Sequence, residues 1–523
     1  MPRYAIDALR YRDDFVRELP GDLRTDDPRP RPVLGACYSH VRPTPVSAPV
    51  LLALVPEVAA LLELDPTPTR DLVDTLAGNR IAPLMRPYAA CYGGHQFGSW
   101  AGQLGDGRAI TLAEVQNDRG ESWEIQLKGA GPTPYSRHAD GRAVLRSSLR
   151  ELVCSEAMHH LGVPTTRALS LVATGDGVMR DFFYDGHPRL EPGAIACRVA
   201  PSFLRFGSYE IHAARRDTAT LARLVDFTRR RYYPEIAGDG PDAIAAMFAE
   251  ICRRTAALAV EWTRVGFVHG VLNTDNMSIL GLTIDYGPYG WVEPFDLDWT
   301  PNTTDAEHGR YRFGQQGQVA MWNLVQLGNA WVPLVGAGEP LQRGIELAAA
   351  ELERGFRRMM LDKLGLRPTD TAADDATIGE LVGALSSTEV DMTRFFRGLS
   401  DLPAVGVGSE LAISALLDDA EYAPPRDDAL RAWLVRYLAR VAVEGEPRLE
   451  RAARMRRVNP RFVPRNYLVQ EVIDRVESTG DASALTELLD VLRHPYDEQP
   501  GREAYAAKRP EWARNRAGCS MLS

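Results

Sequence analysis

The sequence predicts an α+β protein of two lobes, a small N-terminal lobe with a sheet and one helix, followed by a larger helical lobe. Between residues 109 and 200, short apolar or alternating runs separated by turn residues are typical of strands. From about residue 215, apolar residues recur at helical spacing instead. We therefore expect an N-terminal extension (1–85), a small lobe (86–200), a large lobe (201–345) and a C-terminal helical region (346–523).

Composition excludes several classes of protein. A net charge of −10 argues against a surface that coats nucleic acid, and 45% hydrophobic with 25% charged residues is ordinary for a soluble chain. The most apolar segment, residues 50–64, contains Pro56 and Glu57 and is not expected to cross a membrane. The six cysteines form no Cys-x-x-Cys pair. We expect a cytoplasmic protein that binds neither nucleic acid nor membrane.

The small lobe begins with a glycine-rich stretch, residues 92–108, that precedes two predicted strands. The first strand covers 109–115, and the second covers 123–128 with clean alternation and ends in Lys128. Of the 60 basic residues only three are lysines, which leaves 57 arginines. A lysine kept in such a chain indicates that a compact ammonium is required there. The stretch alone could be a set of tight turns, but the lysine strand behind it favours a loop that covers phosphates.

A helix is predicted over 143–161, ended by Gly162 and Pro164. It carries Glu151, our candidate for the carboxylate partner of Lys128, with Glu156 as the reserve. Further strands are expected at 165–173 and 194–200. Arg198 and Arg205 follow near the junction of the lobes, where arginines can clamp phosphate oxygens bidentately.

The large lobe contains the stretch with the clearest chemistry. A long helix with Asp242 at its start and Gly266 after its end leads into residues 269–276, His-Gly-Val-Leu-Asn-Thr-Asp-Asn. The apolar run 277–284 predicts a tight hairpin that places Asn276 beside Asp285. Two such oxygen ligands, with room for water, suit Mg²⁺ bound to the phosphates of a nucleotide.

This order of elements is that of the protein kinases: glycine-rich loop, lysine strand, helix with a glutamate, catalytic loop and Asp-x-Gly. One position departs from the kinase pattern. The catalytic aspartate of the kinase loop would fall at Val271, and valine accepts no proton. No Walker A loop, His-Glu-x-x-His motif or Gly-x-Ser-x-Gly elbow is present.

Several longer strings of residues are distinctive: Gly-His-Gln-Phe-Gly at 94–98, residues 100–108, Lys-Gly-Ala-Gly at 128–131, residues 133–137, 140–146, 198–207 and 266–282, and Asp-Tyr-Gly-Pro at 285–288. They are dense between about 92 and 290 and thinner elsewhere. These strings closely resemble one family, selenoprotein O, also called YdiU, whose members are protein adenylyltransferases of kinase-like fold. The resemblance implies that ATP binds in a flipped orientation and that AMP passes to Ser, Thr or Tyr of a protein, with release of pyrophosphate.

The resemblance also implies the site residues. Asp275 is the proton acceptor, and Asn276 and Asp285 hold Mg²⁺, or in its place Mn²⁺. The residues expected at the nucleotide are Gly105, Gly107, Arg108, Lys128, Asp140, Gly141, Arg198 and Arg205, with Glu151 beside Lys128.

Two other functions stay open from the sequence. One is a phosphotransferase that moves the γ-phosphate with Asp275 as its base, and the other is an inactive nucleotide-binding scaffold. Cys519 lies near the C-terminus, at the position where animal members of the family carry selenocysteine, and we expect it on a mobile tail as a reactive thiol. The resemblance also implies that some family members pair this residue with a cysteine just after the Asp-Tyr-Gly segment. Residues 288–310 of this chain contain no cysteine, so a disulfide of that design is not expected here.

Overall fold

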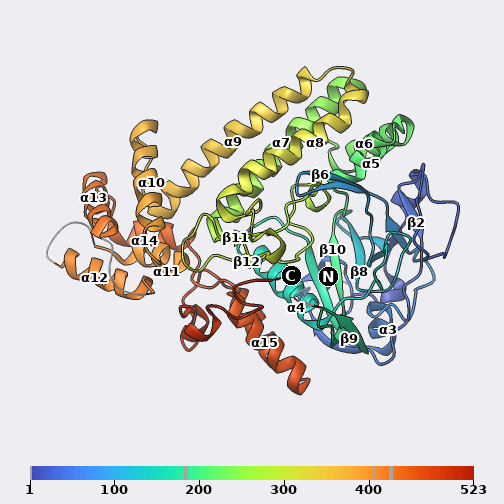
Figure 1. Cartoon of the computed structure of the whole chain (residues 1–523), viewed down its shortest axis with the longest axis horizontal. Coiled ribbons are helices and arrows are strands. Elements are labelled where there is room, and N and C mark those ends of the chain that lie inside the picture. The colour runs from blue at the N-terminus through green and yellow to red at the C-terminus, as the bar shows by residue number, and fades with distance from the viewer. Residues whose placement is uncertain (1–2, 182–185, 404–407, 423–427, 523) are drawn as a thin grey trace.

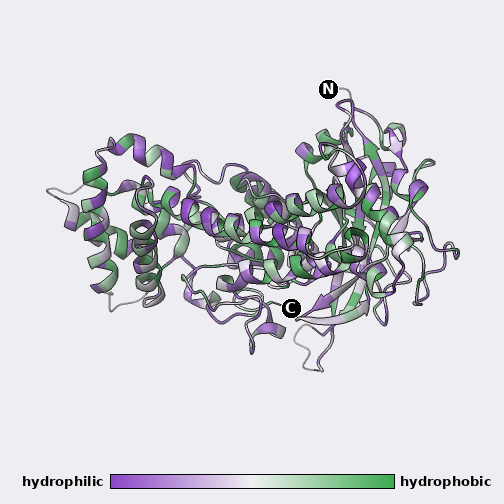
Figure 2. Ribbon diagram, turned by 90° about the horizontal axis from the view of Figure 1, so that it is seen from above, coloured by the Kyte–Doolittle hydropathy of each residue, from purple (hydrophilic) through white to green (hydrophobic). Residues whose placement is uncertain are grey.

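The computed structural model describes residues 3–181, 186–403, 408–422 and 428–522. The sheet lies in the N-terminal half of the chain and helices make up the C-terminal half (Figure 1). The two ends of the chain lie close together in the view of Figure 1 but apart in the view from above (Figure 2). Helices α1 to α16 span Asp14–Glu18, Pro56–Leu61, Arg70–Leu76, Leu145–His160, Phe206–Ala214, Thr218–Tyr232, Gly240–Val265, Gln316–Val335, Glu339–Leu364, Thr371–Ser386, Met392–Gly398, Ser409–Ala420, Asp428–Glu444, Arg448–Arg456, Asn466–Thr479 and Ser483–Leu492.

An eight-stranded antiparallel sheet organises the N-terminal half. Its strands are β1 (Tyr11–Arg12), β2 (Tyr38–His40), β3 (Val50–Leu54), β4 (Tyr88–Ala90), β7 (Ala109–Gln116), β8 (Ser122–Lys128), β9 (Arg167–Arg180) and β10 (Arg189–Ala200). The order is β2-β4-β7-β8-β10-β9-β3, and β1 pairs with β7. The sheet confirms the predicted strands, although β9 and β10 are longer than expected. The turn expected between them includes residues 182–185, which lie outside the described residues.

The first 85 residues belong to this sheet, which the sequence did not predict. They supply β1, β2 and β3, and their apolar side chains pack under one face of β8. Ile125 and Leu127 of β8 are almost fully buried in that cluster. The opposite face of β8 carries Gln126 and Lys128, so alternation along one strand separates the core from the polar face.

Helix α4 packs against β9 and β10, on the face of the sheet away from the cluster of the first 85 residues. Its apolar side chains, among them Leu149 and Leu152, meet Ala168, Leu171 and Ala194 of the two strands. The same cluster takes in α15 and α16 from the end of the chain. Because α4 is fixed from both sides, Glu151 on it has a fixed position relative to the sheet.

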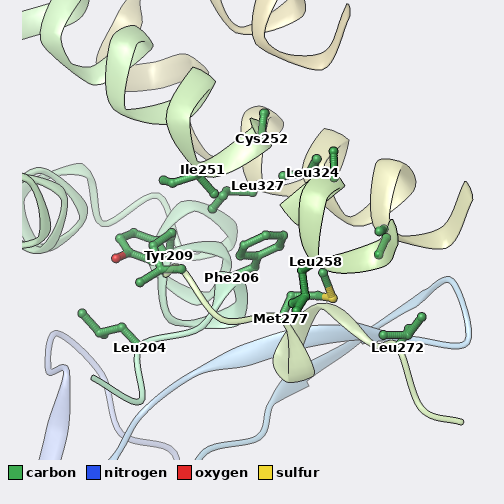
Figure 3. Close-up of a cluster of buried hydrophobic side chains, with 14 of the residues drawn as sticks. Leu204, Phe206, Tyr209, Ile251, Cys252, Leu258, Leu272, Met277, Leu324 and Leu327 are labelled. Atoms are coloured by element: carbon green, nitrogen blue, oxygen red, sulfur yellow. The ribbon is translucent and has the colours of Figure 1, made fainter. Parts of the chain in front are cut away.

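The helical half is centred on the long helices α7, α8 and α9 (Figure 1). Helix α7 ends where Gly266 takes a left-handed conformation (φ 75°), as its predicted stop requires. Figure 3 shows the core between these helices and α5. Leu272 and Met277, which flank residues 273–276, are buried in it together with Leu258 and Leu324. The polar loop is thus anchored by an apolar residue on each side.

Helices α10 to α14 form a further cluster at one end of the molecule, with apolar faces turned inward (Figure 2). A buried ion pair joins the start of α11 to the start of α15. Both terminal nitrogens of Arg465 donate hydrogen bonds to the Asp391 carboxylate, at 2.7 and 2.9 Å. Within the described ranges, no helix is long and apolar enough to cross a membrane.

Candidate active site

The stretch 277–284 forms a short hairpin, closed by a bridge between Met277 and Thr283. His269 fixes the hairpin from behind, because its Nε2 donates to the carbonyl of Ile284 at 2.9 Å. The hairpin brings Asn276 and Asp285 to the wall of one cleft, as the sequence predicted. Asp285 has a left-handed backbone (φ 56°), which is uncommon outside glycine and which aspartate tolerates better than most residues.

Lys128 and Glu151 meet at the base of this cleft. Lys128 Nζ lies 2.7 Å from Glu151 Oε2, so the predicted pair forms and the reserve Glu156 instead binds Arg167. Arg198 adds a second cation, with Nη1 3.1 Å from Glu151 Oε1. It comes from β10, where register places it opposite Gln126 of β8. Sheet pairing therefore places Lys128 and Arg198 side by side, and the packing of α4 brings Glu151 to both.

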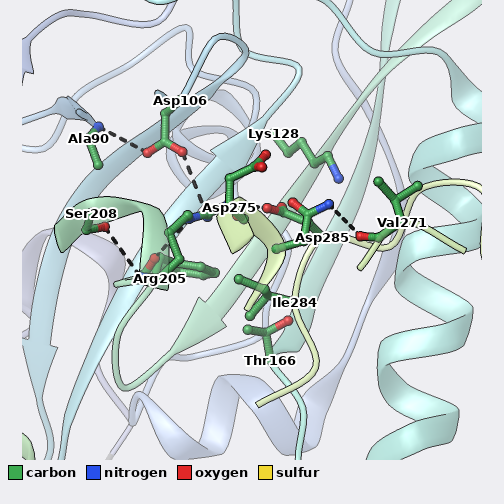
Figure 4. Close-up of polar contacts among 12 residues, drawn as sticks. Ala90, Asp106, Lys128, Thr166, Arg205, Ser208, Val271, Asp275, Ile284 and Asp285 are labelled. Atoms are coloured by element: carbon green, nitrogen blue, oxygen red, sulfur yellow. Dashed lines mark hydrogen bonds and ion pairs between the residues drawn. The ribbon is translucent and has the colours of Figure 1, made fainter. Parts of the chain in front are cut away.

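Asp285 lies between two buried arginines. Arg198 and Arg205 each form an ion pair with its carboxylate, and Arg205 also donates to the backbone carbonyl of Asp275 at 2.9 Å. Burial alone would raise the pKa of Asp285, but Arg205, Arg198 and Lys128 outweigh it and hold that pKa well below its ordinary value. Figure 4 shows Arg205 between Asp275 and the buried Asp106. Asp285 is therefore ionised at neutral pH.

Asp275 is an acid of the opposite kind. Its side chain is buried, and burial raises its pKa to about 7. Gln96 donates its amide to Oδ2 at 3.3 Å, whereas Oδ1 has no hydrogen-bond partner among the described residues. Gly94 lies against the same carboxylate, since a Cβ there would come within 2.6 Å of Oδ1. Oδ2 is thus held by Gln96, and Oδ1 is buried against Gly94 without a partner in the described part of the chain.

Gly94 and Gln96 belong to a two-stranded hairpin, β5 (Gly93–Gln96) and β6 (Ser99–Gln103). The backbone N–H of His95 donates to Thr274 Oγ1 at 2.7 Å, and Glu210 of α5 accepts from the Thr274 hydroxyl and lies 3.0 Å from His95 Nδ1. The glycine-rich stretch therefore does two things. Its hairpin holds the loop of Asp275, while Tyr92, Gln96 and residues 104–108 line the cleft. Contact of this stretch with phosphates stays a prediction.

The cleft has a volume of about 810 Å³ and brings together most of the predicted residues. Those on its wall are Gly105, Gly107, Arg108, Lys128, Asp140, Gly141, Arg198, Asp275, Asn276 and Asp285. Arg205 lies behind Asp285, and Glu151 lines the smaller adjoining pocket. Asp140 forms an ion pair with Arg180 at 2.7 Å and accepts from the backbone of Arg142 at 2.9 Å.

The donor set fits a hard divalent cation that shares its ligands with phosphates and water. Asn276 donates its amide nitrogen to Val271 O at 2.9 Å, which leaves its side-chain oxygen as the ligand atom. Asp285 is held ionised beside it. No set of three or more His, Cys, Asp or Glu residues in the described part of the chain is placed to hold a metal by itself. Such a two-ligand site therefore depends on a nucleotide to complete it.

Three residues of this site were not predicted from the sequence. Gln96 and Asp106 stand inside the glycine-rich stretch, but neither residue type indicated a role there. Glu210 lies on α5, and no pattern in the sequence marked it as a site residue. Asp106 is buried, and burial raises its pKa although Arg205 is 4.0 Å away.

The prediction for Cys519 was wrong. The thiol is only 2% exposed, packed with Tyr467, Leu468 and Ala513, and burial raises its pKa to about 11. The tail is tied down, because Leu522 donates its N–H to Pro301 O at 2.7 Å and accepts from Thr303 N at 3.0 Å. A buried thiol of raised pKa is a poor nucleophile.

Comparison with known proteins defines the class of protein to which this site belongs. A family profile described as "Protein adenylyltransferase SelO" matches residues 29–493. Proteins named "Protein nucleotidyltransferase YdiU" are 59% identical in Aromatoleum aromaticum, over 97% of this chain and 98% of the relative, and 55% identical in Rhodopirellula baltica, over 98% and 99%. The relative of the same name in Nitrosospira multiformis is 52% identical over 98% and 96%.

The cleft thus belongs to an enzyme of the nucleotidyltransferase class. The chain is a member of the SelO family of protein adenylyltransferases.

Proposed function

We propose that this protein transfers AMP from ATP to the hydroxyl groups of Ser, Thr and Tyr in other proteins, with Mg²⁺ bound to the nucleotide. The observation that carries this proposal is the buried Asp275 carboxylate, whose pKa burial raises to about 7. Asp275 lines the cleft that also holds Asn276, Asp285 and the cations Lys128 and Arg198. A base, a metal-ligand pair and phosphate-binding cations are the parts that nucleotidyl transfer needs.

The same site supports a protein-kinase-like fold of two lobes, with boundaries near residues 200 and 345. The small lobe then includes residues 3–85, because β1, β2 and β3 belong to its sheet. A strand lysine paired with a helix glutamate, here Lys128 and Glu151 at 2.7 Å, is the kinase arrangement. The Asp285 hairpin stands where the kinase Asp-x-Gly segment would be.

In the proposed reaction, the acceptor hydroxyl oxygen forms a bond to the α-phosphorus of ATP. The bond from that phosphorus to the oxygen bridging to the β-phosphate breaks, and pyrophosphate leaves with the electron pair. The hydroxyl proton passes to the Asp275 carboxylate. Gln96 assists by donating to Oδ2 at 3.3 Å, so the carboxylate keeps a fixed orientation.

Negative charge develops on the leaving pyrophosphate, and this chain places cations to meet it. Lys128 and Arg198 line the cleft, and Arg205 supports Asp285 from behind. Asn276 and Asp285 would hold Mg²⁺, which neutralises charge on the phosphates when it is bound. The proposed flipped nucleotide puts its α-phosphate near Asp275, with Gly105, Gly107, Arg108, Asp140 and Gly141 as further contacts.

The test uses ATP labelled at the α-phosphate or at the γ-phosphate, with β-casein as the protein acceptor. We expect label from the α-phosphate only, a mass increase of one AMP per modified site, and loss of transfer when EDTA is added. Label from the γ-phosphate only would instead show a phosphotransferase. Binding of ATP with neither label transferred would show a scaffold, and either result would refute the proposal.

A further inference from the structure

The hairpin that holds Asp275 also exposes large apolar side chains to solvent. Phe97 at its tip is 41% exposed and Trp100 on β6 is 38% exposed. Val325 on the neighbouring helix α8 is likewise 38% exposed. Exposed aromatic groups next to a catalytic loop differ from single apolar residues scattered over a surface, which need no explanation.

The backbone of Phe97 is strained and held in place. Its φ of 50° lies in the left-handed region, which a bulky side chain rarely adopts. Its N–H donates to Tyr311 OH at 2.9 Å and to Asn273 Oδ1 at 3.3 Å, so the catalytic loop itself maintains the strain. The ring is thereby presented one residue from Gln96, which touches Asp275. Strain maintained beside a reactive carboxylate is an observation that points to function.

Aromatic contacts join the hairpin to α8. The ring centroids of Trp100 and His95 are 5.1 Å apart, and those of His95 and Trp322 are 5.5 Å apart. Trp322 and Val325 lie three positions apart on α8 and so share a face. We call Phe97, Trp100, Trp322 and Val325 the aromatic platform.

One cation borders the platform without a counter-ion. The guanidinium of Arg310 lies 4.9 Å from the ring centroid of Trp322. Among the described residues no carboxylate pairs with its guanidinium, and its Nε is buried without a hydrogen-bond partner. An arginine held against an aromatic ring and lacking a carboxylate can accept one from another molecule.

We propose that the aromatic platform and Arg310 bind the acceptor protein, as an extended segment with an apolar or aromatic side chain and a carboxylate near the target hydroxyl. This inference rests on the proposed function. The platform is continuous with the base, since Phe97 follows Gln96 directly, so a segment lying on it passes the Asp275 side of the cleft. The unpaired Arg310 selects an acidic neighbour in that segment by charge complementarity.

The test compares the full-length protein with Phe97→Ser and Trp100→Ser combined, with Arg310→Gln, and with Leu411→Ser as the matched control. Leu411 is an exposed apolar residue on α12, 77% exposed and outside the residues that line the cleft. Three quantities are measured: kcat/KM for AMP transfer to β-casein, acceptor-independent release of pyrophosphate from ATP, and the Kd for fluorescent β-casein.

We expect the double variant to lower kcat/KM for casein about tenfold and to weaken casein binding about as much. Pyrophosphate release without acceptor should stay near the wild-type value. Arg310→Gln should have a smaller effect, and its casein binding should lose part of its salt dependence. Leu411→Ser should match the wild type in all three measurements.

Unchanged casein binding and kcat/KM in the double variant would overturn the inference, as would a wild-type protein that does not bind casein saturably. If the platform instead joins two copies of this chain, the wild type will sediment as a dimer that the double variant disrupts, with casein binding unaffected. The binding measurement needs no catalysis. A failure of the proposed transfer reaction is therefore distinguishable from a failure of this inference.

Discussion

Two buried arginine–aspartate pairs in this molecule differ in what surrounds them. In the C-terminal region, Asp391 accepts from Arg465 through both oxygens and also from Tyr422 OH at 2.8 Å and Arg394 N at 3.0 Å, and its side chain is fully buried. In the cleft, the Asp285 side chain bound by Arg205 keeps 19% of its surface exposed.

The difference separates a structural pair from a functional one. Both oxygens of Asp391 are hydrogen-bonded and its side chain is fully buried, so its charge serves the packing of α11 and α15. Asp285 faces a cleft of about 810 Å³ and has cations that a bound nucleotide could engage in its place. A buried ion pair by itself does not mark a site, and what marks one is access to a cavity together with unsatisfied partners.

Replacing each aspartate tests this contrast with the largest expected effects. Asp391→Ala leaves the buried Arg465 with only Glu293 as a described carboxylate partner, 3.8 Å away, and should destabilise folding by about 3–5 kcal/mol. Asp285→Ala should lower AMP transfer about 1000-fold or more through loss of a metal ligand. Its loss of stability should be smaller, because Arg198 keeps Glu151, Arg205 keeps Asp106 at 4.0 Å, and the site of the removed side chain opens to the cleft. Urea unfolding and a transfer assay on both variants give the comparison. An inactive Asp391→Ala that unfolds like the wild type would contradict it.

Asp275→Asn tests the base directly. The amide cannot take the proton, so kcat should fall about 100- to 10,000-fold while the Kd for ATP changes little. Single-turnover transfer and equilibrium ATP binding measure the two quantities. Equal losses in ATP affinity and in kcat would show that Asp275 contributes to ATP binding and does not act as the base.

Glu151→Gln weakens the anchoring of Lys128 and Arg198 without changing the shape of the side chain. Loss of a charge-assisted bond of about 1.5–3 kcal/mol predicts a decrease in kcat/KM of roughly 10- to 100-fold. The matched control is Glu156→Gln, which breaks the buried pair with Arg167 away from the cleft. Thermal unfolding of both shows how much of each effect is stability alone.

Gln96→Ala should reduce kcat about tenfold, because it frees the carboxylate to rotate. It should also move the acidic limb of the pH–rate profile. Transfer needs ionised Asp275, so activity rises as pH increases through its pKa of about 7. The Gln96 amide lowers that pKa, and without it the limb should shift to higher pH. Ser99→Ala on the same hairpin is the control, and a limb that stays in place would exclude this role for Gln96.

Cys519→Ser is expected to have the smallest effect. The thiol is buried and outside the cleft, so transfer should change by less than about twofold and stability by about 1 kcal/mol. Iodoacetamide should label Cys519 in native protein far more slowly than in urea-unfolded protein. Rapid labelling of the native protein would instead support the mobile tail that the sequence suggested.

Much of the fold and site followed from local patterns. Alternation predicted β8 and placed Lys128 on its polar face, and the apolar spacing of α4 and α7 with glycine at their ends set those helices. Short-range geometry was enough for the hairpin that brings Asn276 and Asp285 to one wall. The rarity of lysine singled out Lys128, which lines the cleft and pairs with Glu151, but Lys363 is buried too and donates to Arg264 O at 2.8 Å.

The sequence alone therefore determined the secondary-structure elements and the candidate site residues. It could do so because helical and strand periodicity and turn residues act over only a few positions. Only the tertiary structure decided that the first 85 residues complete the sheet, that Gln96 and Glu210 hold the loop of Asp275, and that Cys519 is buried. Each of these depends on contacts between segments far apart in the sequence, 64 residues for Glu210 with Thr274 and 179 for Gln96 with Asp275, or on contacts between the tail and the core. Burial, not residue type, raised the pKa of Asp275 and of Cys519. Local patterns carry no record of such packing.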